Sequence, residues 1–320
     1  MQKLTIQQRA SILRSLVEGN SARATVRMTG ISLPTVLDYM VKAGQALHAY
    51  HNETVRGLEC REIQLDEIWS FVGCRENTKK RAEGRHPGDV WTWTSLCAHT
   101  KMIPAWRVGD RSMRTGYAFC ADLAARVSGD CQITSDGHPV YRSAVPMNFP
   151  KADFAMLIKI YGKDAEGKDV VIGTEKKPIQ GNPDIDRIST SFVERSNLTI
   201  RMGNRRFTRL TNAFSKKLEN HASMLAITFT HYNFCRLHMS LPKQTPAMAA
   251  GVADEPLTIE DLVEIVTKFH VNALEARFEA AFAAKYDAPR KFPKSYAPTP
   301  KDQLELPWYL NPESGGEPEE

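Results

Sequence analysis

The chain has 320 residues and a net charge of +5, with 42% apolar and 25% charged residues, which is ordinary for a globular protein with a sizeable core. Its N-terminus lacks an apolar leader, and no run reaches the roughly 18 uninterrupted apolar residues of a membrane span, so a cytoplasmic protein is expected. The six cysteines include no C-x-x-C pair, which argues against a zinc ribbon.

The charge is unevenly distributed along the chain. Residues 296–320 contain one lysine and six acids, which leaves +10 for residues 1–295. Residues 195–217 contain seven basic residues and no acid: Arg195, Arg201, Arg205, Arg206, Arg209, Lys216 and Lys217. Such a block is often a solvated face, but beside catalytic acids it would bind phosphates.

Residues 1–46 have the pattern of three short helices. Thr5 can cap a helix over 6–18, and Ser21 can cap a second over 22–28. Gly30 makes a turn before a third helix that ends at about Val41. This order favours a helix-turn-helix DNA-binding domain over a plain three-helix bundle. The exposed candidates on the third helix are Ser32, Thr35, Asp38, Tyr39 and Lys42.

After a polar linker over 47–61, the pattern predicts an α/β domain over 62–254. Its expected elements are strands at 62–73, 90–98 and 102–108, a helix at 113–127 and a strand at 131–135. Three antiparallel-looking strands, a helix, a further strand and then helices form an α/β plan.

The remaining segments are less regular. Residues 137–188 are rich in proline and glycine and are interpreted as an insertion with short strands at 154–161 and 169–174. The helical predictions that follow are 189–235, 245–250, 259–269 and 272–285, the last two within a C-terminal helical segment over 255–295. Residues 296–320 are expected to form an extended or disordered acidic tail.

Three carboxylates stand where a lone charge is unusual. Asp66 lies inside a strand pattern, Asp136 ends a strand before Gly137, and Glu194 begins a helix. Charged residues are depleted in strands and are costly when buried unpaired. If the three meet in one cleft, a cation must join them, and oxygen ligands favour Mg²⁺. The sequence therefore predicts metal-assisted phosphodiester chemistry.

Strand alternation selects Asp66 rather than Glu67. Glu67 shares its strand face with the apolar Leu65 and Trp69, whereas Asp66 lies on the more polar face with Gln64 and Ser70. Taken alone, Asp66 also fits an edge-strand acid paired with an arginine, and Asp136 also fits a plain turn.

Glu194 is the sharpest of the three. On a helix, Glu194, Asn197 and Arg201 would lie on one face, so the acid could hold an ion while the arginine binds a nearby phosphate. A surface ion-pair helix is the alternative. The 58-residue step from Asp136 leaves Glu166 and Glu175 as rivals, and Glu194 is favoured because it shares a helix with Arg201.

Other polar residues are candidates for a supporting role: His138, His231, Arg236 and His238. His138 follows Asp136 by two residues and could contact a substrate phosphate. A zinc pair of His231 and His238 is conceivable, but core packing or hydrogen bonding around the site is favoured.

Three segments resemble the catalytic signatures of insertion-sequence DDE transposases: QLDEIW (64–69), ITSDG (133–137) and FVERSN with the following residues to Arg201 (192–201). Residues 109–112, 231–238 and 245–247 also look like that group. The resemblance covers about residues 1–250, but the long step to Glu194 and the acidic tail depart from the pattern.

The resemblance implies a ribonuclease H-like core, a mixed sheet flanked by helices. In it, Asp66, Asp136 and Glu194 would hold two Mg²⁺, with Mn²⁺ as a substitute. It implies cleavage at transposon ends and strand transfer into target DNA. The partners would be double-stranded DNA of both kinds and a second copy or larger assembly of the chain, with no membrane, in a nucleoid-associated cytoplasmic setting. The expected DNA contacts are Ser32, Thr35, Tyr39, Lys42, Asn197, Arg201, Arg205, Arg206, Arg209, Lys216 and Lys217.

Three alternatives remain open. The first is a catalytically inactive, transposase-derived DNA-binding regulator. The second is a nuclease of the same fold that cleaves without joining. The third is a metal-dependent phosphohydrolase for small substrates, against which the basic segment and the N-terminal helices argue.

Overall fold

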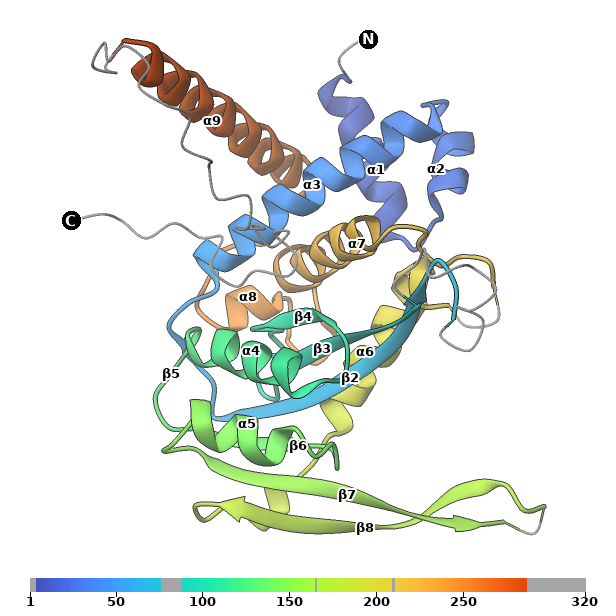
Figure 1. Ribbon diagram of the computed structural model, residues 1–320, viewed down its shortest axis with the longest axis vertical. Helices are drawn as coiled ribbons and strands as arrows, with labels where there is room; N and C mark the ends of the chain where they lie inside the picture. The colour runs from blue at the N-terminus through green and yellow to red at the C-terminus, as the bar shows by residue number, and fades with distance from the viewer. Residues whose placement is uncertain (1–3, 76–87, 165, 209–210, 287–320) are drawn as a thin grey trace, which may run out of the picture.

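The computed structural model describes residues 4–75, 88–164, 166–208 and 211–286, and its centre is a six-stranded mixed sheet (Figure 1). In spatial order the strands are β4 (Trp106–Gly109), β3 (Gly88–Cys97), β2 (Glu62–Val72), β6 (Gln132–Ser135), β7 (Asp153–Lys163) and β8 (Asp169–Gln180). The α/β class and the flanked mixed sheet that the sequence predicted are confirmed.

The direction of the strands changes at β2. Strand β3 is antiparallel to both β2 and β4, whereas β6 runs parallel to both β2 and β7. Strand β8 returns antiparallel along β7. The pairing of β2 with β6 ends at Leu65 opposite Ser135, so Asp66 and Asp136 are the next residues on the two strands.

Helices cover both faces of the sheet because the buried side chains of β2 alternate between two cores. On one face, Leu65 packs in a core with α4 (Met113–Ala124) and α5 (Tyr141–Asn148). On the other face, Ile68 packs in a core with α6 (Ser191–Gly203) and α7 (Leu218–Thr230). Figure 1 shows α4 and α5 in front of the sheet and α6 behind it.

The N-terminal helices are α1 (Ile6–Val17), α2 (Ala22–Thr29) and α3 (Leu33–Thr54). Thr5 and Ser21 accept the predicted capping hydrogen bonds, and Gly30 ends α2 with φ = 70°. The linker predicted over 47–61 is wrong in its first half, since α3 continues to Thr54. Its apolar face, including Leu47, is buried in a core shared with α7 and α9 (Ile259–Tyr286), and this contact keeps the helix intact.

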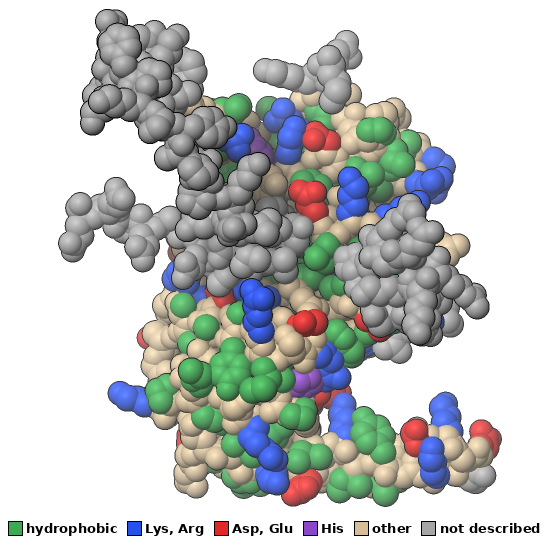
Figure 2. Space-filling model, viewed as in Figure 1, with side chains coloured by type: hydrophobic (Ala, Val, Ile, Leu, Met, Phe, Trp, Pro, Cys, Tyr) green, Lys and Arg blue, Asp and Glu red, His purple; other side chains and the backbone are tan. Residues whose placement is uncertain are grey.

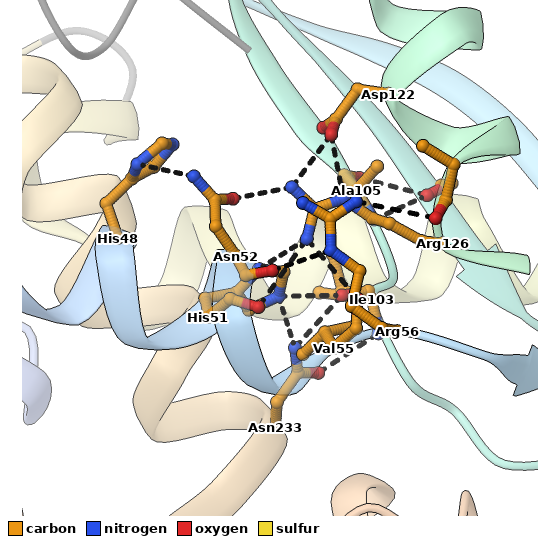
Figure 3. A network of polar contacts seen from close by, with 12 residues as sticks. His48, His51, Asn52, Val55, Arg56, Ile103, Ala105, Asp122, Arg126 and Asn233 are labelled. Carbon is orange, nitrogen blue, oxygen red and sulfur yellow. Dashed lines mark hydrogen bonds and ion pairs between the residues drawn. The ribbon is translucent and has the colours of Figure 1, made fainter. Parts of the chain in front are cut away.

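Buried polar groups fasten the C-terminal end of α3 to the sheet domain (Figure 3). Arg126, 3% exposed, donates to Asn52 Oδ1 at 2.5 Å and pairs with Asp122 at 2.8 Å. Asn233 donates to the Ile103 carbonyl at 3.0 Å and accepts from the Ile103 amide at 3.0 Å. Because unpaired buried polar groups are costly, this arrangement holds the N-terminal helices and the sheet together.

The helical prediction over 189–235 is wrong in its continuity. Helix α6 ends at Gly203, and the Asn204 side chain caps a 3-10 helix, Arg205–Phe207, by accepting from the Arg206 amide at 3.1 Å. Helix α7 follows and leads into a π-helical turn, His231–Cys235.

Smaller elements complete the described chain. Residues 137–188, interpreted as an insertion, supply β7 and β8 and are therefore part of the sheet. The short helix expected over 245–250 is α8 (Pro246–Ala249), which Thr245 caps, and the two helices predicted over 259–285 are the single α9. The others are the parallel pair β1 (Leu58–Glu59) and β5 (Val127–Ser128) and a 3-10 helix, Ile185–Arg187.

Within the described residues, no helix combines the length and apolar character needed to cross a membrane. The acidic tail predicted over 296–320 and the end of the C-terminal segment, 287–295, lie outside those residues.

Candidate active site

The structure brings together the three carboxylates that the sequence singled out. Asp66 lies on β2, Asp136 directly follows the neighbouring β6, and Glu194 is in the first turn of α6. Burial and the negative charge of Asp136 raise the pKa of Asp66 to about 6, and Glu194 adds to the rise. The three acids therefore share one electrostatic environment and repel one another.

Two polar side chains of β2 hold α6 in place. Gln64 Oε1 accepts from the backbone amides of Phe192 and Val193 at 2.9 and 3.0 Å, which satisfies donors that the start of a helix leaves free. Asp66 Oδ2 accepts from Asn197 Nδ2 at 2.7 Å. Gln64 and Asp66 are two residues apart on one strand face, so α6 lies along β2 and Glu194 lies near Asp66.

Glu194 also has a basic partner that sequence reasoning missed. Its Oε1 accepts from Lys159 Nζ at 2.7 Å and from Thr190 Oγ1 at 2.8 Å. Lys159 comes from β7, inside the segment interpreted as an insertion. Strand alternation could have assigned Lys159 to a face, but not identified the carboxylate opposite it.

The rival acids are elsewhere. Glu166 and Glu175 are exposed on the hairpin of β7 and β8, whereas Glu194 contributes to the raised pKa of Asp66. The position of Glu194 therefore supports it as the third acid.

The donor chemistry of the three acids fits a hard divalent cation, since all three supply carboxylate oxygens. Such an ion would also neutralise the negative charges that repel one another around Asp66. In the described part of the chain, however, no three potential ligand side chains are arranged to hold one ion together. Glu194 is bonded to Lys159 and Thr190 instead. The three acids therefore have suitable ligand atoms for a divalent cation, but these atoms do not surround one common position.

Glu67 is buried close to this site, although alternation places it on the opposite strand face. Burial and the charge of Asp136 raise the pKa of Glu67 to about 7. Arg111 donates to Glu67 Oε2 at 2.8 Å, and its guanidinium lies over the Trp91 ring at 4.4 Å. Glu67 is therefore a buried carboxyl group within the electrostatic reach of Asp136, and strand alternation alone did not identify it.

The expected DNA reader on α3 is only partly exposed. Ser32 is exposed and its hydroxyl lies 2.8 Å from that of Thr35, while Lys42 is exposed and pairs with Asp38 at 3.0 Å. Tyr39, expected on the surface, is 5% exposed, and burial raises its pKa. Its assignment as a DNA contact is wrong because the ring packs in the core of α1, α3 and α7.

The basic segment divides into surface and interior residues. Asn197 is 1% exposed and bonded to Asp66, so its assignment as a DNA contact is wrong. Arg206 is also turned inward: it donates to Ser215 Oγ at 2.8 Å, and burial lowers its pKa to about 10.

The other basic positions remain candidate phosphate contacts. Arg205, Lys216 and Lys217 are exposed, Arg201 is half-buried, and Arg209 lies outside the described residues. On the face drawn in Figure 2, Lys and Arg side chains are interspersed with acidic and apolar ones rather than gathered in one stripe.

The candidate supporting residues have different surroundings. The His138 backbone amide donates to Asp136 Oδ1 at 3.0 Å, while the His138 ring packs against Trp93. Burial lowers the pKa of His231, and it lowers the pKa of His238, which packs against Tyr232, to about 4. Arg236 is exposed. Among these, His138 is the one bonded to a carboxylate of the site.

Comparison with protein-family models and with curated proteins finds no match for this chain.

Proposed function

We propose that the chain is a DDE-type DNA transposase that cleaves DNA at transposon ends and joins the ends to target DNA. The observation that carries the proposal is the meeting of Asp66, Asp136 and Glu194 from β2, the end of β6 and the start of α6. The strand order, with three antiparallel strands and then two parallel ones, supports the ribonuclease H-like core that the resemblance implies.

In this proposal Asp66, Asp136 and Glu194 hold two Mg²⁺, or Mn²⁺ in their place. The ions would supply an activated oxygen nucleophile and would stabilise the leaving 3′ oxygen. Asn197 and Gln64 fix the acids by binding Asp66 and the start of α6. Exposed basic residues such as Arg205 and Lys216 bind the DNA backbone.

The N-terminal helices α1 to α3 recognise the end sequences as a helix-turn-helix. The capped helices, the left-handed turn at Gly30 and the exposure of Ser32 and Lys42 support this role. Two ends must be held together for transfer, so a homodimer or larger assembly acts on the DNA.

Asp66→Asn tests the proposal because the amide keeps the shape of the side chain and removes its charge. We expect the variant to lose Mg²⁺-dependent cleavage and strand transfer but to keep its affinity for end DNA. Asp130→Asn, at an exposed acid, is the matched control and should retain both reactions. Undiminished transfer by Asp66→Asn would contradict the assignment.

One observation favours the inactive regulator as a second candidate. Glu194 is already paired with the Lys159 ammonium, as in a site that holds no ion. Cleavage of end DNA in the presence of Mn²⁺ would exclude this candidate, and joining of the cleaved ends would exclude a simple nuclease.

A further inference from the structure

Lys159 is a basic residue bonded directly to one of the three acids, Glu194. Its Nζ lies 2.7 Å from Glu194 Oε1, and its charge also acts on Asp66. Lys159 is therefore placed within the acidic cluster and compensates part of its negative charge.

The pair is also easy to separate. The side chains of Lys159 and Glu194 are 36% and 42% exposed, and an exposed ion pair contributes little to stability. The buried pair of Arg126 and Asp122, 3% and 12% exposed, illustrates a fixed ion pair in the same protein. The Glu194 carboxylate can therefore exchange partners without disturbing α6, which Gln64 and Asn197 hold independently.

We propose that Lys159 is a displaceable internal counter-ion of the acidic site, which neutralises Glu194 until a divalent cation takes its place. The inference rests on the proposed function, because it concerns the same three carboxylates. It explains why these acids meet and yet are not arranged around a single ion: the third one faces an ammonium. Binding of the cation to the Glu194 carboxylate then requires the release of Lys159, so the ammonium group and the cation compete for this carboxylate.

Titration calorimetry with Mn²⁺ alone tests the competition. Lys159→Met removes the ammonium and keeps the length of the side chain, so we expect Mn²⁺ to bind roughly fivefold more tightly than to the unchanged protein, the upper end for an exposed pair. Lys163→Met is the matched control on the same strand, because Lys163 pairs with Asp169 at a distance of 2.6 Å and not with the three acids. The affinity of this variant for Mn²⁺ should not change. Equal or weaker binding by Lys159→Met overturns the inference.

A second measurement needs no substitution. Acylation of the unchanged protein with a lysine-reactive ester, read by mass spectrometry, should modify Lys159 faster when Mn²⁺ is added, while Lys163 should react at the same rate. An unchanged rate at Lys159 overturns the inference even if the methionine variant fails to fold.

The two proposals fail in different ways. If Asp66→Asn abolishes Mn²⁺ binding and cleavage while both lysine measurements are negative, the site stands and the counter-ion role is wrong. If neither the unchanged protein nor Lys159→Met binds Mn²⁺, the metal site and the counter-ion role are both wrong.

Discussion

At the scale of single residues, Asn197 links a carboxylate of the candidate site, Asp66, to Thr94 in the interior of the sheet. Its amide donates to Asp66 in partly buried surroundings, and its oxygen accepts from the buried Thr94 Oγ1 at 3.3 Å. The bond from Asn197 also lowers the pKa of Asp66, against the effects of burial and of Asp136. Asn197 therefore favours the charged form of the carboxylate that the proposed reaction needs.

Asn197→Ala should lower the free energy of unfolding by about 1–3 kcal/mol, because it leaves buried polar groups unpaired. It should also slow cleavage while leaving the affinity for end DNA unchanged. Urea denaturation and a DNA-binding titration measure the two effects, with Asn212→Ala at an exposed asparagine as the control. Unchanged stability together with an unchanged rate of cleavage would contradict this role of Asn197.

The sequence was enough to place Asp66 inside a strand and Asp136 at the end of another, because alternation and a following glycine mark these positions. It was not enough to predict Lys159 or the role of Gln64. Both depend on which element packs against a given strand face, and that is decided by the tertiary fold rather than by local periodicity. Tyr39 and Arg206 were assigned to the surface for the same reason. Helical spacing shows which residues share a face of the helix, but it does not show which other element packs against that face.

At the scale of elements, α3 and α7 touch at a glycine. A Cβ on Gly44 would lie 2.4 Å from Ser223 Cα and 2.4 Å from Ser223 Cβ, which are parts of α7 that cannot turn aside. The close approach of the two helices therefore requires the missing side chain at residue 44.

Gly44→Ala should destabilise the protein by about 1–3 kcal/mol, because the helices must move apart. The matched control is Gly203→Ala in α6, where a Cβ would meet no atom within 4 Å and helix propensity predicts a gain of up to about 1 kcal/mol. Thermal unfolding of both variants decides the point. Equal stability of the two variants would show that the helices adjust without strain.

The third helix was predicted to end at about Val41, whereas α3 continues through Gly44 to Thr54. Its continuation depends on packing against α7, which no local pattern shows. Conversely, the caps at Thr5 and Ser21 were predictable because they use short-range hydrogen bonds. Helix α6 ends at Gly203, and Asn204 caps the 3-10 helix that follows. This cap was not predicted because the surrounding residues have a continuous helical pattern.

At the scale of the whole molecule, buried histidines connect stability to pH. Burial is the main cause that lowers the pKa values of His221 and His48 to about 3. Burial also lowers the pKa of His51. His221 is fully buried. Their folded pKa values lie below the unfolded value of about 6.5, so the unfolded state takes up protons first. Each histidine therefore removes stability as the pH falls from about 6.5 towards 3.

The acids at the site act in the opposite direction. The pKa values of Asp66 and Glu67 are raised to about 6 and about 7, so their protonation favours the folded state as the pH falls below those values. The histidine effect is therefore best measured as a difference between variants. Between pH 7 and pH 5, the unchanged protein should lose roughly 2 kcal/mol more than His221→Gln, by urea unfolding at each pH. An identical pH dependence of the two proteins would contradict the prediction.

The α/β plan was predictable from the order of strand and helix patterns, and the resemblance implied the mixed sheet flanked by helices. The relation of the N-terminal helices to the sheet was not, because residues 1–46 show the capping and turn signals of a complete small domain. The apolar residues that α3 buries against α7 and α9 are far away in sequence, and no local pattern connects them.

The unbroken course of α3 limits how the protein can be dissected. A fragment that starts at residue 47 would begin inside a helix, and it would expose Met224, Ile227 and Leu262 on α7 and α9 to water. A fragment that stops at residue 46 would lack the surfaces that cover its own apolar face. The N-terminal helices therefore cannot be exchanged for those of another protein unless the faces of α7 and α9 change with them.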